Sequence, residues 1–130
     1  MENLLHVGLD VGSTTVKIVV MNENRNTIYR DYQRHFSDTK NTVCNVLENL
    51  ATRYPNSLLT IALTGSGAMS AAKFLDLPFI QEVVACKRAV EKYIPHTDVV
   101  IELGGEDAKI IYFDKSIEQR MNGTCAGGTG

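Results

Sequence analysis

The chain has 130 residues, of which 44% are hydrophobic and 22% charged, and its formal net charge is −2. This length supports one genuine hydrophobic core, and the weak negative charge without a long basic run argues against nucleic-acid binding as the main activity. No apolar stretch approaches the roughly 18 residues of a membrane span, and no basic region followed by an apolar core opens the chain, so we expect a cytoplasmic protein without a membrane anchor.

The first half of the chain predicts strands followed by a crossover. Apolar runs predict three successive strands over residues 4–9, 16–21 and 27–33, whose short connections imply antiparallel neighbours. Helical spacing of apolar residues then predicts a helix around residues 43–51, with Asp38 among its candidate caps. A strand over 58–63 and a short helix over 68–75 follow, which completes a strand, helix, strand crossover.

The second half repeats the opening order. A helix is predicted over residues 82–93, and Glu82 is interpreted as a favourable charge at the helix start. Three more strands are predicted over residues 99–103, 108–113 and 117–121. Two strand, turn, strand openings are typical of a duplicated two-lobed fold, although no residue-by-residue repeat is evident.

Each opening carries an acidic residue beside glycines. In the first, Asp10 ends an apolar run, Gly12 lacks a Cβ, and Ser13, Thr14 and Thr15 add hydroxyls next to backbone N–H groups. Such a turn suits a phosphate chain, with Lys17 as nearby positive charge. Asp10 is the kind of carboxylate that partners hydrated magnesium at a phosphate site. The alternative is an ordinary hairpin turn in which Asp10 and Ser13 satisfy their own backbone.

The second opening and the end of the chain extend this pattern. Glu102 ends an apolar run before Gly104 and Gly105, and Cys125 lies in a bed of small residues. A glycine-rich loop leaves a thiol exposed and its backbone N–H groups available to an inorganic cluster. The alternatives are a glycine-rich loop with a buried free cysteine and a flexible terminus, because one cysteine cannot hold a four-thiolate cluster.

The order of these motifs resembles the BadF/BadG/BcrA/BcrD/HgdC-type ATPases, the activators of 2-hydroxyacyl-CoA dehydratases and benzoyl-CoA reductases. These belong to the acetate kinase, sugar kinase, heat-shock chaperone and actin superfamily. The resemblance covers essentially the whole chain, through the four segments that residues 10–15, 64–67, 103–109 and 121–130 form. The last segment is specific to the activators, whereas kinases and chaperones share the phosphate segments.

The resemblance implies a fold and a division into domains. The expected fold is α/β, a ribonuclease H-like (actin-like ATPase) lobe with a mixed sheet, plus the opening strands of a second lobe. Residues 1–98 would form the first lobe and residues 99–130 the truncated start of the second. The chain is expected to stop before the adenosine-binding glycines and the second cysteine of the family, so that alone it would be inactive.

The resemblance also implies a site and its cofactors. Asp10 and Glu102 would be catalytic and would hold magnesium through water, while ATP or ADP would bind at Gly12, Ser13, Thr14, Thr15, Lys17, Gly104 and Gly105. Cys125 would be a ligand of a 4Fe-4S cluster shared across a homodimer. The partner would be a dehydratase or reductase acting on an acyl-CoA, separate or fused downstream.

Three positions depart from the family pattern. Glu102 replaces the usual Asp, Glu106 replaces the usual Gln, and Ala68 stands where an Arg commonly follows the Thr-Gly-x-Gly turn. Glu106 exchanges a neutral amide for an acceptor that repels phosphate unless it is protonated or turned away.

The function implied is an ATP-hydrolysing iron-sulfur activator that drives low-potential electron transfer to a 2-hydroxyacyl-CoA dehydratase or related acyl-CoA reductase. Two alternatives stay open: a small-molecule kinase of the same superfamily, and a non-redox ATP-dependent assembly or sensor module. Cys44 and Cys86 are interpreted as small packed side chains, and the three histidines show no metal-ligand spacing.

Overall fold

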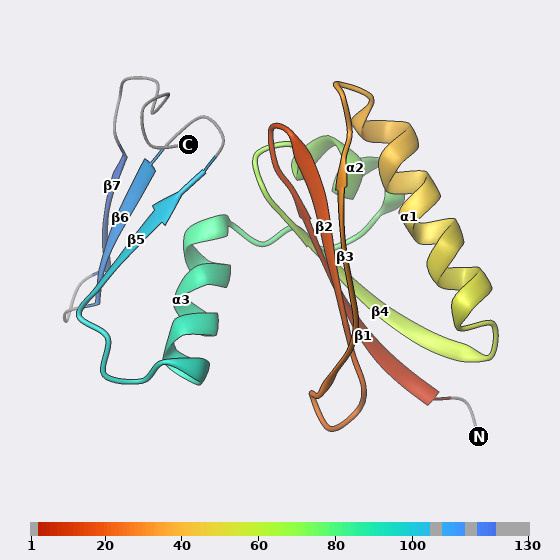
Figure 1. Cartoon of the computed structure of the whole chain (residues 1–130), viewed down its shortest axis with the longest axis horizontal. Helices are drawn as coiled ribbons and strands as arrows, with labels where there is room; N and C mark the ends of the chain where they lie inside the picture. Colours follow the sequence, from red (N-terminus) through yellow and green to blue (C-terminus); the bar gives the residue numbers. More distant parts are fainter. Residues whose placement is uncertain (1–2, 105–107, 114–116, 122–130) are drawn as a thin grey trace. The chain divides into compact units, whose positions relative to one another are not determined.

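The computed structural model describes residues 3–104, 108–113 and 117–121 (Figure 1). It divides into two compact units, residues 1–80 and 81–130, which are described separately. The lobe boundary expected at residue 98 concerns the full-length protein and stays a prediction.

The first unit is a mixed four-stranded sheet with two helices. Its elements are β1 (Asn3–Val11), β2 (Thr15–Met21), β3 (Thr27–Arg34), α1 (Thr39–Arg53), β4 (Ser57–Thr64) and α2 (Ala68–Leu75). The strand order is β3-β2-β1-β4, with β1–β2 and β2–β3 antiparallel and β1–β4 parallel. The short connections therefore give antiparallel neighbours, and the crossover through α1 gives the parallel pair, as the sequence predicts.

Alternation along β1 sets the two faces of this sheet. Every second residue, from Leu5 to Val11, is buried in a core shared with Val46 and Leu50 of α1. Asp10 alternates with these residues and therefore lies on the opposite face of the sheet. Figure 1 shows α1 running alongside the strands.

The cap of α1 and the end of β1 can be compared with the predictions from the sequence. Asp38 caps α1, because its side chain accepts a hydrogen bond from the Asn41 N–H at 3.4 Å. β1 extends beyond its predicted end because Val11 pairs with Val16. Asp10 consequently lies inside β1, one residue before its end, rather than at the end itself.

The second unit contains one helix and an antiparallel three-stranded sheet. Its elements are α3 (Glu82–Tyr93), β5 (Val99–Leu103), β6 (Ala108–Phe113) and β7 (Ile117–Met121), in strand order β5-β6-β7. The face of β5 that carries Val100 and Glu102 is half-buried, and opposite it on β6 Lys109 and Ile111 are buried. Within the described ranges, no helix is both long and apolar enough to cross a membrane.

Candidate functional site

Asp10 and Lys17 form an ion pair at the mouth of the first hairpin. The two residues are directly opposite each other in the β1–β2 register, and Asp10 Oδ2 lies 3.0 Å from Lys17 Nζ. The side chains are 37% and 47% exposed, respectively. Because an exposed ion pair contributes little to stability, this pair can exchange partners at little cost. The sequence placed both residues at a phosphate site, and the structure brings them together.

The turn between β1 and β2 offers backbone donors to solvent. Gly12 N–H closes the turn by donating to the Thr15 carbonyl at 2.9 Å. Ser13 and Thr14 are exposed, and within the described part of the chain neither of their N–H groups donates to another protein group. Two adjacent unused N–H groups beside hydroxyls are the kind of donors that suit an anion. Thr15 differs from its neighbours because it is buried at the base of the turn.

The fold itself does not require glycine at position 12. A Cβ built on Gly12 would meet only Thr15 atoms, the nearer being the carbonyl oxygen at 3.6 Å, which is an ordinary contact. The absence of a side chain there leaves the turn open on its solvent side. This openness is what a bound phosphate chain would use.

Gly65 and Gly67 lie directly against the Asp10 segment. Gly65 has φ +106°, and a Cβ on it would be 2.3 Å from the Val11 carbonyl oxygen and 2.6 Å from Asp10 Oδ1. The Gly67 N–H donates to the same Val11 carbonyl at 2.8 Å. The loop from Thr64 to Gly67 therefore supports Asp10. The sequence placed this loop only by its resemblance, and the contact depends on the parallel β1–β4 pairing.

Thr64 carries a buried polar atom without a partner. Thr64 is opposite Asp10 in the β1–β4 register, and its buried Oγ1 makes no hydrogen bond within the described chain. A buried hydroxyl left unpaired costs about 1–3 kcal/mol, so such an atom calls for a bound water or ligand. Carboxylate and hydroxyl oxygens, with no nitrogen or sulfur among them, are the donors that suit hydrated magnesium. The residues around Asp10 therefore fit that ion.

His35 supports the turn through hydrogen bonds to its backbone. It is 6% exposed, and its Nε2 lies 3.1 Å from the Gly12 carbonyl oxygen. Its Nδ1 accepts from the Ser37 N–H at 3.1 Å, so Nε2 carries the proton and donates to Gly12. The His35 N–H also donates to the Thr14 carbonyl at 3.2 Å. The sequence missed this role because a single histidine gives no spacing signal.

A hollow of about 200 Å³ adjoins the same turn. It is lined by Ser13, Thr14, Arg34, His35, Phe36 and Ser37. Arg34 adds a second cation to Lys17 around the turn, which favours an anionic ligand.

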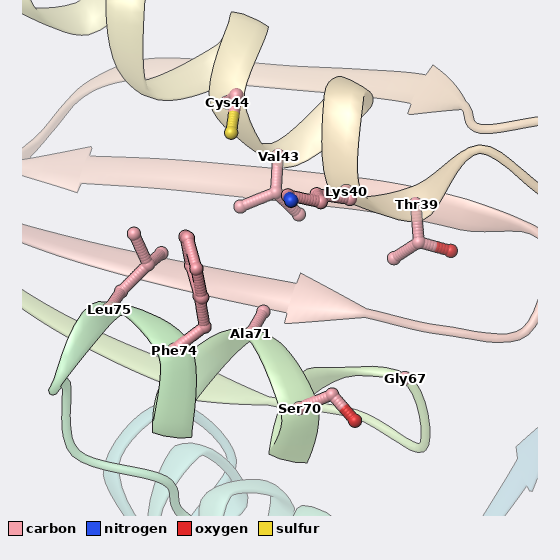
Figure 2. A pocket seen from close by; sticks show the side chains of 9 residues that line it. All are labelled: Thr39, Lys40, Val43, Cys44, Gly67, Ser70, Ala71, Phe74 and Leu75. Carbon is pink, nitrogen blue, oxygen red and sulfur yellow. The ribbon is translucent and has the colours of Figure 1, made fainter.

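A larger and more apolar pocket of about 480 Å³ lies between α1 and α2 (Figure 2). Gly67, Cys44 and Phe74 are among the residues that line it. The Lys40 ammonium lies 5.0 Å from the centre of the Phe74 ring. We assign no ligand to this pocket because its walls are mostly carbon.

The second acidic segment belongs to the second unit. Glu102 is half-buried on β5, and Gly104 follows the strand end, whereas Gly105, Glu106 and Cys125 lie outside the described residues. Lys109 is directly opposite Glu102 in the β5–β6 register, yet its ammonium forms an ion pair with Glu82. Burial raises the pKa of the Cys86 thiol, the Glu102 carboxylate raises that pKa further, and Lys109 opposes them.

The described residues contain no metal cluster. Within the described ranges, no group of three or more His, Cys, Asp or Glu side chains could hold a metal ion, and Cys44 and Cys86 are free thiols. The predicted iron-sulfur ligand, Cys125, therefore stays a prediction.

The statistical model of the BadF/BadG/BcrA/BcrD ATPase family matches residues 7–130. The chain belongs to this family. It is 28% identical over 130 residues to the (R)-2-hydroxyglutaryl-CoA dehydratase activating ATPase of Acidaminococcus fermentans, covering 95% of this chain and 49% of that protein. It is 30% identical over 131 residues to the 2-hydroxyisocaproyl-CoA dehydratase activator of Clostridioides difficile, covering 95% and 48%.

A solved structure of the Clostridium difficile activator with bound ADPNP superposes with a TM-score of 0.78 at 28% identity, covering 97% of this chain and 48% of that one. The chain thus spans about half the length of the relatives it matches. The mixed sheet and this likeness confirm the predicted ribonuclease H-like, actin-like ATPase fold.

Proposed function

We propose that the full-length protein is an ATP-hydrolysing iron-sulfur activator that drives low-potential electron transfer to a 2-hydroxyacyl-CoA dehydratase or related acyl-CoA reductase. One observation carries the nucleotide half of this proposal. In a chain of this ATPase family, Ser13 and Thr14 are exposed residues whose N–H groups are unused within the described residues, and they follow Asp10 closely in the sequence. The relative solved with bound ADPNP supports a nucleotide as the ligand.

Both acidic segments would take part in nucleotide binding, as the resemblance of their motifs implies. The phosphate chain would bind the turn from Gly12 to Thr15, with Lys17 as positive charge, and the backbone at Gly104 and Gly105. Asp10 and Glu102 would hold magnesium through its waters, and this ion would neutralise charge that develops on the transferred phosphoryl group. Because phosphoryl transfer needs little covalent help from a protein, these residues would act by positioning and electrostatics.

The redox half of the proposal rests on family membership and on Cys125. Two chains of a homodimer would share one 4Fe-4S cluster, which supplies single-electron transfer when bound. The partner would be a dehydratase or reductase component that acts on an acyl-CoA, as the names of the relatives indicate for them. Thiols without a paired motif fit a reducing cytoplasm.

Anaerobic reconstitution of the full-length protein with iron and sulfide tests this function. We expect a brown wild-type protein with bound iron, loss of that iron in Cys125→Ser, and retention in the control Cys44→Ser, whose thiol lies beside the α1–α2 pocket. A colourless wild type that still hydrolyses ATP would overturn the activator proposal in favour of a kinase or an assembly ATPase.

A further inference from the structure

Asp10 is flanked by one residue on each neighbouring strand of the first sheet. β1 lies between β2 and β4, and the residues opposite Asp10 in register are Lys17 on β2 and Thr64 on β4. Residues in register on neighbouring strands point to the same face of a sheet, so these three side chains lie on one face. The Asp10 carboxylate therefore has an ammonium on one side and a hydroxyl on the other.

The two oxygens of that carboxylate have different surroundings. Oδ2 accepts a hydrogen bond from Lys17 Nζ at 3.0 Å, whereas Oδ1 accepts none from a described residue. Oδ1 lies beside the loop that follows β4, because a Cβ on Gly65 would be 2.6 Å from it. Lys17 thus engages one carboxylate oxygen, and the other lies on the β4 side.

Thr64 presents a buried hydroxyl on that same side. Among the described residues, its Oγ1 has no hydrogen-bond partner, although Thr64 is in register with Asp10. Side chains in this register can bond directly, since four residues earlier on both strands Thr60 Oγ1 lies 2.8 Å from His6 Nδ1. At Asp10 and Thr64 the register instead leaves two polar groups side by side without a direct bond. A water molecule can bridge such a pair.

A water of hydrated magnesium has a defined requirement for hydrogen-bond partners. Magnesium retains several of its waters at phosphate sites. Because the oxygen of such a water faces the metal, its two hydrogens donate to two acceptors. The Asp10 carboxylate offers Oδ1 as one acceptor, and the lone pairs of a hydroxyl oxygen offer another.

From this geometry we infer that Thr64 is a positioning residue of the nucleotide site: its hydroxyl and the Asp10 carboxylate hold the same water of hydrated magnesium. The inference rests on the proposed function, which assigns Asp10 to that ion. It gives the buried Oγ1 of Thr64 the partner that such an atom calls for.

Magnesium titrations of ADP binding to the full-length protein, combined with thermal melts, test the inference. Thr64→Val keeps the branched shape of the side chain and removes the hydroxyl. The magnesium concentration for half-maximal ADP binding should rise about three- to tenfold, the usual worth of one hydrogen bond. The melting temperature without magnesium and ADP should stay at or above that of wild type, because a buried unpaired hydroxyl has been removed. A purely structural role of Thr64 does not predict weaker magnesium binding in a protein that is no less stable.

Matched variants identify the hydroxyl of Thr64 as the cause. Thr64→Ser keeps the hydroxyl and should need about as much magnesium as wild type does. Thr60→Val makes the same change on the same face of β4, where the hydroxyl is bonded to His6 and Leu5, and should leave the magnesium requirement unchanged. If Thr64→Val does not fold, Thr64→Ala removes the same hydroxyl and should give the same rise.

Three results would overturn the inference. These are an unchanged magnesium requirement when the Thr64 hydroxyl is removed, an equal rise in Thr64→Ser, and an equal rise in Thr60→Val. Failure of the wild type to bind ADP at any magnesium concentration would instead refute the proposed nucleotide site.

Discussion

Gly65 lies so close to Asp10 that a Cβ on Gly65 would be 2.6 Å from the carboxylate Oδ1. Together with its φ of +106°, this contact makes glycine necessary for the fold at that position. At Gly12 the fold leaves room for a side chain. The two glycines around Asp10 thus have different reasons to be glycine.

Paired alanine substitutions separate those reasons. Gly65→Ala should destabilise the protein by more than about 1 kcal/mol, because the new Cβ clashes and φ is positive. Gly12→Ala should leave the melting temperature near that of wild type and weaken ATP binding instead. Melting curves and nucleotide titrations of the two variants make the comparison. A Gly12→Ala variant that binds ATP as wild type does would remove the ligand-based reason for glycine there.

Asp10→Asn should impair magnesium-dependent nucleotide binding with little effect on stability. The ion pair with Lys17 is exposed, so its loss should cost at most about 1 kcal/mol in the free energy of unfolding. Loss of the carboxylate should raise the magnesium requirement at least about tenfold, as expected for a group that supports the metal. Lys17→Met is the control that breaks the same ion pair and keeps the carboxylate. An equal magnesium requirement in wild type and Asp10→Asn would remove Asp10 from the metal site.

His35→Ala should loosen the phosphate turn. The substitution removes the hydrogen bond that Nε2 donates to the Gly12 carbonyl and the one that Nδ1 accepts from the Ser37 N–H. Because His35 is buried, we expect the free energy of unfolding to fall by about 1–3 kcal/mol. ATP affinity should fall as well, since the turn loses its support. Urea unfolding and nucleotide titration check the two effects. His6→Ala is a suitable control, because His6 hydrogen-bonds Thr60 away from the turn at 2.8 Å.

Cys86 should make stability fall at alkaline pH. Burial raises its pKa in the folded state, so the folded protein retains this thiol proton to a higher pH than the unfolded chain does. The stabilising contribution is complete below the unfolded pKa of about 8.5 and is lost as pH rises through the folded value. Unfolding free energies measured across pH 7–10 should decline more in wild type than in Cys86→Ser. Parallel curves for the two proteins would contradict this prediction.

Local patterns predicted the elements of this fold well. The bounds of α2, α3 and the last three strands match the predicted ranges, because Gly, Pro and turn residues punctuate the chain at each end. The capping role of Asp38 followed from the same local chemistry. The family itself was evident from short motifs, each of which is made of residues that are adjacent in the sequence.

Contacts between distant residues were not predictable in the same way. Gly65 contacts Asp10 because β1 and β4 pair in parallel, although about fifty residues separate them in the sequence. His35 forms a hydrogen bond with Gly12 because β3 runs antiparallel to β2 and ends beside the first turn. The ion pair of Glu82 with Lys109 joins a helix start to a strand that follows it 27 positions later. Sequence periodicity fixes which face a residue occupies but not which distant residue it meets there.

We propose that the turn at residues 12–15 binds nucleotide phosphates through the Ser13 and Thr14 N–H groups. Residue-resolved amide hydrogen exchange of the full-length protein, with and without magnesium and ADP, can follow these two groups individually. Both residues are exposed and their N–H groups are unused within the described residues, so these amides should exchange rapidly without nucleotide and become protected when it binds. The exposed amide of Asn24, in the β2–β3 hairpin, should remain unprotected throughout. Rapid exchange at Ser13 and Thr14 in protein saturated with nucleotide would contradict the claim.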